Sequence, residues 1–137
     1  MRYVGVLCCV VAFVIVGAYA MPAAAHHSFA AEFDGAKVVT MTGKVSKVEW
    51  TNPHAFFYVD VKDEKTNEVA NWACELNSPN SLMRLGWTRD SMKVDDVITV
   101  TGSLAKDGSK LLNARTIVMA NTGKRLFAGS SDGTPTR

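Results

Sequence analysis

The sequence predicts an all-β domain with one short helix: an OB-type five-stranded barrel in which the helix lies between the third and fourth strands. Three observations lead to this fold class. Five strand-like runs are separated by turn signals, a helical pattern follows the third run, and the first run is long and bent. A β-sandwich is the main competitor, but it normally needs about seven strands, and the sequence offers five or six.

The first three predicted strands follow from the alternation of apolar residues. Val38–Trp50 changes phase beside Gly43, which predicts a bulge or a strong bend. The second run is His54–Lys62, and the third covers residues 70–76 after a polar loop. The residues expected to point inward on these two runs are Ala55, Phe57, Val59, Val61, Ala70, Trp72, Cys74 and Leu76.

The helical pattern comes next, with start and stop signals on both sides. Ser78 suits the N-cap, Pro79 suits the first helical position, and Gly86 suits the left-handed residue that ends a helix. The expected apolar stripe consists of Leu82, Met83 and Leu85.

Two further strands complete the predicted barrel. Val97–Leu104 should bury Ile98 and Val100, and Asp107-Gly108 should turn the chain into Leu111–Met119. A later turn leads to a short extended segment, Arg125–Phe127.

The first residues have the three-part layout of a secretory signal. Arg2 supplies a positive charge, an apolar run extends from Val4 to Ala20, and small residues follow. Cleavage after Ala25 or after Ala20 fits the rule of small residues before the cut. A retained membrane anchor is the alternative, but the run is short and no basic cluster follows it. We therefore expect a periplasmic or secreted protein.

The predicted organisation has four parts. Residues 1–25 form the cleavable signal peptide, residues 26–37 an N-terminal arm, and residues 38–128 the OB-like domain. Residues 129–137 lack apolar content, which predicts a disordered tail.

Cysteine and charge restrict the function classes. Removing the signal removes Cys8 and Cys9, so Cys74 alone cannot form an internal disulfide. Only Arg2 of the 15 basic residues and none of the 13 acidic residues lie before residue 26, so the remaining chain is nearly neutral. Nucleic-acid binding takes much of its affinity from a basic excess. We expect no nucleic-acid partner, and no membrane contact after signal cleavage.

All three histidines of the chain lie after the predicted signal, at His26, His27 and His54. Cleavage after Ala25 would give His26 a free α-amine beside its imidazole, and His27 or His54 could add a further nitrogen. Cleavage one residue earlier would place histidine third in the chain. Either terminus offers the nitrogen-rich ligands that Cu(II) prefers. After cleavage at Ala20 the histidine pair is only a polar spot in an arm.

A ligand-binding face is predicted on the outward side of the second and third strands. If Phe57 pairs with Cys74, then Phe56 lies opposite Glu75 and His54 lies diagonal to it. OB-type barrels bind ligands on this face. The candidate ligand-binding residues are His54, Phe56, Tyr58, Asn71 and Glu75. The structural alternative is that His54 only caps the strand entrance after the Asn52-Pro53 turn.

Several motifs stand out along the chain: His26–Asp34, Glu49–His54, Asn71–Leu76, Leu85–Asp90 and Val100–Gly102. Together they resemble those of a family of small exported bacterial proteins of unknown function. The likeness covers about residues 25–127. It implies a periplasmic, OB-like domain with no assigned reaction.

Two functional hypotheses from different classes follow. The first is a periplasmic, non-enzymatic binding module for an unknown small ligand or a periplasmic protein partner. The alternative is a copper-handling protein that uses His26 and His27 together with His54. An enzyme ranks third, because spacing fixes no acid–base or nucleophile–base pair, and catalytic residues are therefore not assigned.

Overall fold

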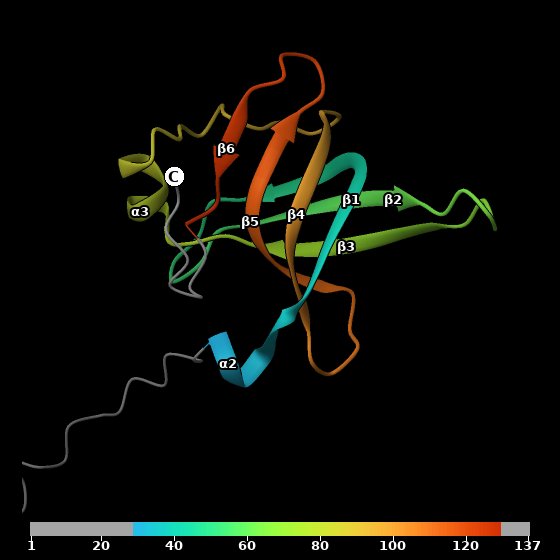
Figure 1. Ribbon diagram of the computed structural model, residues 1–137. Helices are drawn as coiled ribbons and strands as arrows, with labels where there is room; N and C mark the ends of the chain where they lie inside the picture. Colours follow the sequence, from blue (N-terminus) through green and yellow to red (C-terminus); the bar gives the residue numbers. More distant parts are fainter. Residues whose placement is uncertain (1–28, 130–137) are drawn as a thin grey trace, which may run out of the picture.

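The computed structural model describes residues 29–129, and these residues form an all-β domain, as predicted (Figure 1). One six-stranded, mostly antiparallel sheet makes up nearly all of it, with two short helices. The elements in chain order are α2 (Phe29–Glu32), β1 (Phe33–Glu49), β2 (Phe56–Lys62), β3 (Val69–Glu75), α3 (Pro79–Arg84), β4 (Val97–Ala105), β5 (Leu111–Met119) and β6 (Arg125–Phe127).

The strand order is β3-β2-β1-β4-β5-β6, and β3 also pairs in parallel with β5. The predicted order of five strands and one helix is therefore wrong in its count, because a sixth strand and an additional helix are present. The sixth strand has room because β3 occupies only the first part of the β5 edge, at residues 111–113, while β6 pairs with residues 116–118. The predicted short extended segment Arg125–Phe127 is this strand.

Strand β1 is long because it pairs with two neighbours. Its earlier part pairs with β4 and its later part with β2, and Lys44 has a partner in both. The register shifts between Val45 and Lys47, close to the expected bulge beside Gly43. A Cβ on Gly43 would collide with the Asp60 carbonyl oxygen, so the absence of a side chain permits this close approach. The strand begins at Phe33, five residues before the predicted start.

The core lies between the inward faces of the strands and is closed at one end by α3. Its largest fully buried side chains are Phe57, Leu82, Ile98, Leu112 and Ile117. Five of the eight inward residues predicted for the second and third strands are buried, and Val61, Ala70 and Trp72 are partly buried. Removing this apolar area from water is the main term that stabilises the fold.

Helix α3 begins and ends as predicted, but its stripe differs. Ser78 Oγ accepts a hydrogen bond from Ser81 N at 3.3 Å, and Gly86 ends the helix with φ of 88°. Of the three stripe residues only Leu82 is buried, whereas Met83 and Leu85 are exposed. The short helix turns Leu82 toward the core and Met83 away from it, and Leu85 follows the helix as its C-cap residue.

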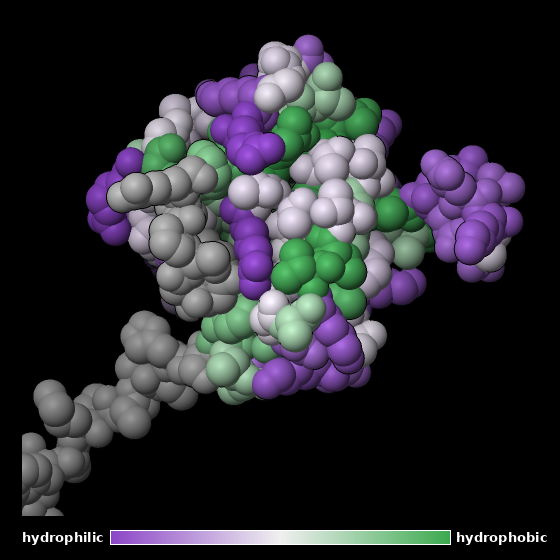
Figure 2. All heavy atoms as spheres, in the orientation of Figure 1, coloured by the Kyte–Doolittle hydropathy of each residue, from purple (hydrophilic) through white to green (hydrophobic). Residues whose placement is uncertain are grey.

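The β2–β3 hairpin extends beyond the rest of the sheet (Figure 1). Its turn, residues 63–68, is hydrophilic and lies clear of the remaining surface (Figure 2). The predicted ligand face lies closer to the body of the molecule, where β3 meets β5.

No helix within residues 29–129 is both long enough and apolar enough to cross a membrane. The predicted signal segment, His26, His27 and residues 130–137 of the predicted tail lie outside the described residues.

Candidate ligand-binding site

The predicted register of the β2–β3 hairpin is confirmed. Phe57 lies opposite Cys74, and Phe56 lies opposite Glu75. The apolar residues of both strands point inward, so the alternate residues share the outer face. Phe56 and Tyr58 on β2 therefore lie on the same face as Glu75.

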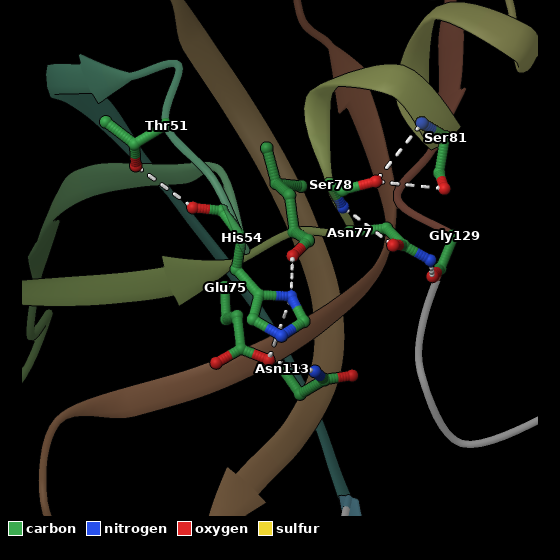
Figure 3. Close-up of polar contacts among 9 residues, drawn as sticks. Thr51, His54, Glu75, Asn77, Ser78, Ser81, Asn113 and Gly129 are labelled. Carbon is green, nitrogen blue, oxygen red and sulfur yellow. Dashed lines mark hydrogen bonds and ion pairs between the residues drawn. The ribbon is translucent and has the colours of Figure 1, made fainter. Parts of the chain in front are cut away.

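His54 is held by the loop that enters β2. Thr51 Oγ1 donates a hydrogen bond to the His54 carbonyl oxygen at 3.0 Å, and the Asn52–Pro53 peptide bond is cis. The His54 Nδ1 atom lies 3.1 Å from the Leu76 carbonyl oxygen (Figure 3). A carbonyl oxygen only accepts, so Nδ1 carries a proton, and in the neutral ring Nε2 has the lone pair.

Glu75 is the acidic partner in this corner. The residue is only 9% exposed, and its Oε1 atom lies 4.0 Å from His54 Nδ1. Asn113 Nδ2 donates a hydrogen bond to the same oxygen at 3.1 Å. The parallel pairing of β3 with β5 places Glu75 directly beside Asn113. Because a buried carboxylate needs hydrogen-bond donors, this pairing helps to keep Glu75 at the site.

The polar cluster continues across β5 and β4. Asn113 lies opposite Ser103, and both are almost fully buried. Arg115 Nη2 donates to Ser103 Oγ at 3.0 Å and to the Gly35 carbonyl oxygen at 3.4 Å. Sequence reasoning missed Asn113 and Arg115. Their alternation with the buried residues of β5 was the available signal, but it did not identify β3 as the neighbouring strand.

Tyr58 forms a separate group next to β1. Its hydroxyl donates to Glu49 Oε2 at 3.0 Å, and Lys47 Nζ lies 5.2 Å from the centre of its ring. Lys47 also forms an ion pair with Glu49. Hydrogen bonds from Lys47 first and Tyr58 second lower the pKa of the Glu49 carboxyl. The bond to Glu49 and burial both raise the pKa of Tyr58.

Asn71 lies at the far end of the same face. Its Nδ2 atom donates to Asp60 Oδ1 at 2.7 Å and to Ser46 Oγ at 2.9 Å. The five predicted ligand residues thus fall into three groups. His54, Phe56 and Glu75 are together, whereas Tyr58 and Asn71 each have polar partners of their own.

The described residues contain no group of three histidine, cysteine or acidic side chains that could hold a metal ion. His54 and Glu75 supply two potential ligands. Cys74 is buried on the opposite, inner side of β3, and burial raises the pKa of its thiol to about 12. The prediction that Cys74 points inward is confirmed.

The first described residues pack beside this cluster. Phe29 stacks on Phe33 with ring centres 5.7 Å apart, and its ring lies where a Cβ on Gly35 would meet it at 3.4 Å. Lys106 N donates to the Glu32 carbonyl oxygen at 2.9 Å, and the Lys106 ammonium group donates to a further carbonyl of α2. The Arg115 side chain on β5 therefore reaches the irregular stretch of β1 that follows Phe33, whose backbone pairs with Ala105 of β4.

The comparisons with known proteins identify one family. A family model described as "Family of unknown function (DUF6152)" matches residues 14–113, a range that contains His54, Glu75 and Asn113. The search of curated proteins and the search of solved structures gave no match. The matched range covers well over half of the chain. The chain therefore belongs to this family of unknown function, DUF6152.

Proposed function

We propose that the protein is a periplasmic, non-enzymatic binding module on an OB-type barrel, and that its small ligand or protein partner contacts the outer face around His54 and Glu75. The single observation that carries this proposal is the fixed orientation of His54 beside a nearly buried carboxylate.

The strand pairings support the OB-type barrel. Strand β1 pairs with β2, β2 with β3, β3 with β5, β5 with β4, and β4 with β1, so five strands follow one another in a ring. Helix α3 lies between β3 and β4 in the chain. OB-type barrels bind their ligands on the face of the second and third strands, which here carries Phe56 and Glu75.

The chemistry of the corner favours a ligand that donates hydrogen bonds or carries positive charge. The Nε2 atom of neutral His54 is an acceptor, and within residues 29–129 no hydrogen bond engages it. Glu75 is an acceptor when ionised, and Phe56 adds a half-buried ring beside it. A rigid carboxylate and imidazole next to an aromatic ring form a small set of polar groups in apolar surroundings, as binding sites typically do.

Nuclear magnetic resonance on the ¹⁵N-labelled protein tests this proposal. The small-molecule fraction of a bacterial periplasmic extract should shift the backbone amides of His54, Phe56, Glu75 and Leu76. The shifts should weaken in Glu75→Gln and persist in the matched control Asn71→Ala, which changes the far end of the same face. Shifts confined to another surface, or equal shifts in Glu75→Gln, would refute the proposal.

Copper binding is a second candidate, and the orientation of His54 favours it. Metal-bound imidazoles commonly donate their other ring N–H to a carbonyl oxygen, as His54 Nδ1 does to Leu76. His26 and His27 come shortly before Phe29, whose ring lies near Gly35, and the Gly35 carbonyl oxygen accepts a hydrogen bond from Arg115 of the cluster. Because three extended residues span about 10 Å, His26 can lie up to that distance from Phe29. The nitrogen ligands that the described residues lack would come from this histidine pair.

Calorimetric titration with Cu(II) tests the second candidate. The chain that begins at His26 should bind one Cu(II), and the variant with both His26→Ala and His27→Ala should lose this binding. His54→Ala should weaken the binding and move the electron paramagnetic resonance spectrum toward fewer nitrogen ligands. Parent-like binding by the double variant would exclude copper handling at this site and leave the binding-module proposal intact.

A further inference from the structure

A second cleft lies away from His54, between two connecting segments at one end of the sheet. One wall comes from residues 86–96, which connect α3 to β4, and the other from residues 119–124, the β5–β6 turn. Both segments are at the top of Figure 1. The cleft has a volume of about 380 Å³, which suits a small molecule.

Hydrogen bonds to neighbouring strands hold each side of the cleft. Ala120 N on the second wall donates to the carbonyl oxygen of Val97, the first residue of β4, at 2.9 Å. Trp87 Nε1 donates to the Phe127 carbonyl oxygen at 2.8 Å and anchors the first wall to β6. Met119, which is almost completely buried, also lines the cleft. The cleft is therefore part of the folded framework and does not need a ligand to form it.

Internal hydrogen bonds also shape each wall separately. On the first wall Thr88 N donates to Ser91 Oγ at 2.8 Å, and Lys93 N donates to Asp96 Oδ2 at 2.8 Å. On the second wall Lys124 N donates to Thr122 Oγ1 at 3.2 Å. The side chains that face the cleft are thus held on short, well-bonded turns.

Apart from the Asp90–Lys93 ion pair, the two walls carry opposite charges. Lys93 Nζ lies 3.7 Å from Asp90 Oδ1, which pairs those two charges on the first wall. Within residues 29–129, neither Asp96 nor Lys124 takes part in an ion pair. One carboxylate therefore remains on the first wall and one ammonium group on the second.

We propose that this cleft binds a small zwitterion of the amino-acid class, such as a dipeptide with free ends. Its ammonium group would face Asp96 and its carboxylate would face Lys124. The hydroxyl groups of Thr88 and Ser91 and the amide of Asn121 offer additional hydrogen bonds to the peptide unit. The proposal concerns a different surface from the His54–Glu75 site and does not depend on it.

Three matched probes separate the two charge contacts. L-alanyl-L-alanine carries both charges, N-acetyl-L-alanyl-L-alanine lacks the ammonium group, and L-alanyl-L-alaninamide lacks the carboxylate. The amides of Thr88, Ser91, Asn121 and Thr122 should respond most strongly to the zwitterion. Because charge-assisted hydrogen bonds are about twice as strong as neutral ones, each capped probe should bind about tenfold more weakly.

Two substitutions then assign the contacts. Lys124→Gln should remove the preference for the zwitterion over the amide probe, and Asp96→Asn should remove its preference over the acetylated probe. The carboxamide introduced by Asp96→Asn would still offer an oxygen to Lys93 N–H, so the turn is retained. The control Lys110→Gln removes an exposed lysine from the β4–β5 turn and should change neither preference.

Equal binding of the three probes, or no amide shift at the cleft, would overturn the proposal. Binding of the acetylated probe alone would assign the cleft to simple anions, and binding of the amide probe alone would assign it to cations. Both of these results would reject the zwitterion. An unchanged order of affinities in Lys124→Gln and Asp96→Asn would reject the assigned contacts.

Discussion

At the scale of single residues, the nearly buried Glu75 is the unusual feature of the outer face. Carboxylates are seldom buried without hydrogen-bond donors, because leaving water costs free energy. Asn113 supplies one such donor, and His54 lies at the edge of the same corner. This arrangement makes Asn113 as important for the site as the residues on the predicted face.

Asn113→Ala should lower the free energy of unfolding by about 1–3 kcal/mol, because it removes a hydrogen bond to a buried charged group. Asn71→Ala removes hydrogen bonds on the exposed end of the same face and should cost less, about 0.5 kcal/mol. Urea denaturation of both variants measures the difference. Equal losses of stability would contradict the special role given to Asn113.

Cys74 should be chemically inert in the native protein. Burial raises the pKa of its thiol from 9.0 to about 12, so the reactive thiolate is scarce at pH 8. Iodoacetamide at pH 8 should leave the peptide that contains Cys74 unlabelled until urea unfolds the chain. Rapid labelling without urea would show that the interior behind β3 opens readily.

The same pKa shift predicts a loss of stability at high pH. The Cys74 thiol favours the folded state fully below pH 9.0, where the unfolded thiol is still protonated. As the pH rises from 9.0 toward 12, the unfolded thiol ionises and the folded one does not, so this contribution is lost. Tyr58 acts in the same direction, because its pKa is also raised. Unfolding curves of Cys74→Ala should therefore depend less steeply on pH in this range.

At the scale of elements, close approaches between strands determine where glycine is needed. A Cβ on Gly102 would collide with the Asn113 carbonyl oxygen and crowd the Leu112 side chain, because β4 and β5 shift register at this point. Gly35 differs, since a Cβ there would meet only the Phe29 ring at ordinary contact distance.

Gly102→Ala should therefore lower the free energy of unfolding by about 1–3 kcal/mol through overpacking. Gly35→Ala is the matched control and should change stability by less than about 0.5 kcal/mol. Thermal unfolding of the two variants gives the comparison. A neutral Gly102→Ala would mean that the two strands can separate at this point without loss.

The elements also show what could be predicted from the sequence. The register of the β2–β3 hairpin could be predicted because a slip of one residue would turn every apolar side chain outward. The start of β1 could not, since residues 34–37 have no alternation and lie in a strongly irregular stretch between the pairs Phe33–Ala105 and Val38–Ser103. The contact of Glu75 with Asn113 depends on the parallel β3–β5 pairing, which no local pattern reveals.

At the scale of the whole molecule, the two candidate binding regions are separate from each other and lie at the edge of the core, where Met119 belongs both to the core and to the lining of the second cleft. The apolar interior stabilises the strands, the His54–Glu75 corner lies on the outside where β3 meets β5, and the second cleft lies between connecting segments at one end. The segment from α2 into β1 is joined to Lys106, which follows β4, and to Arg115 on β5 by hydrogen bonds. Changes at either binding region should therefore leave the core, and with it the fold, intact.

Binding at His54 and Glu75 is the central claim, and a native mass spectrum of the protein taken from the periplasm without chelators tests it most directly. The spectrum reports the first residue of the chain and any molecule or metal that stays bound. We predict a chain that begins at Ala25 or His26 with a bound mass that is lost in the variant with His54→Ala and Glu75→Gln. A bound mass that the double variant retains would contradict the claim, whereas a chain that begins at Met21 would exclude only the copper candidate.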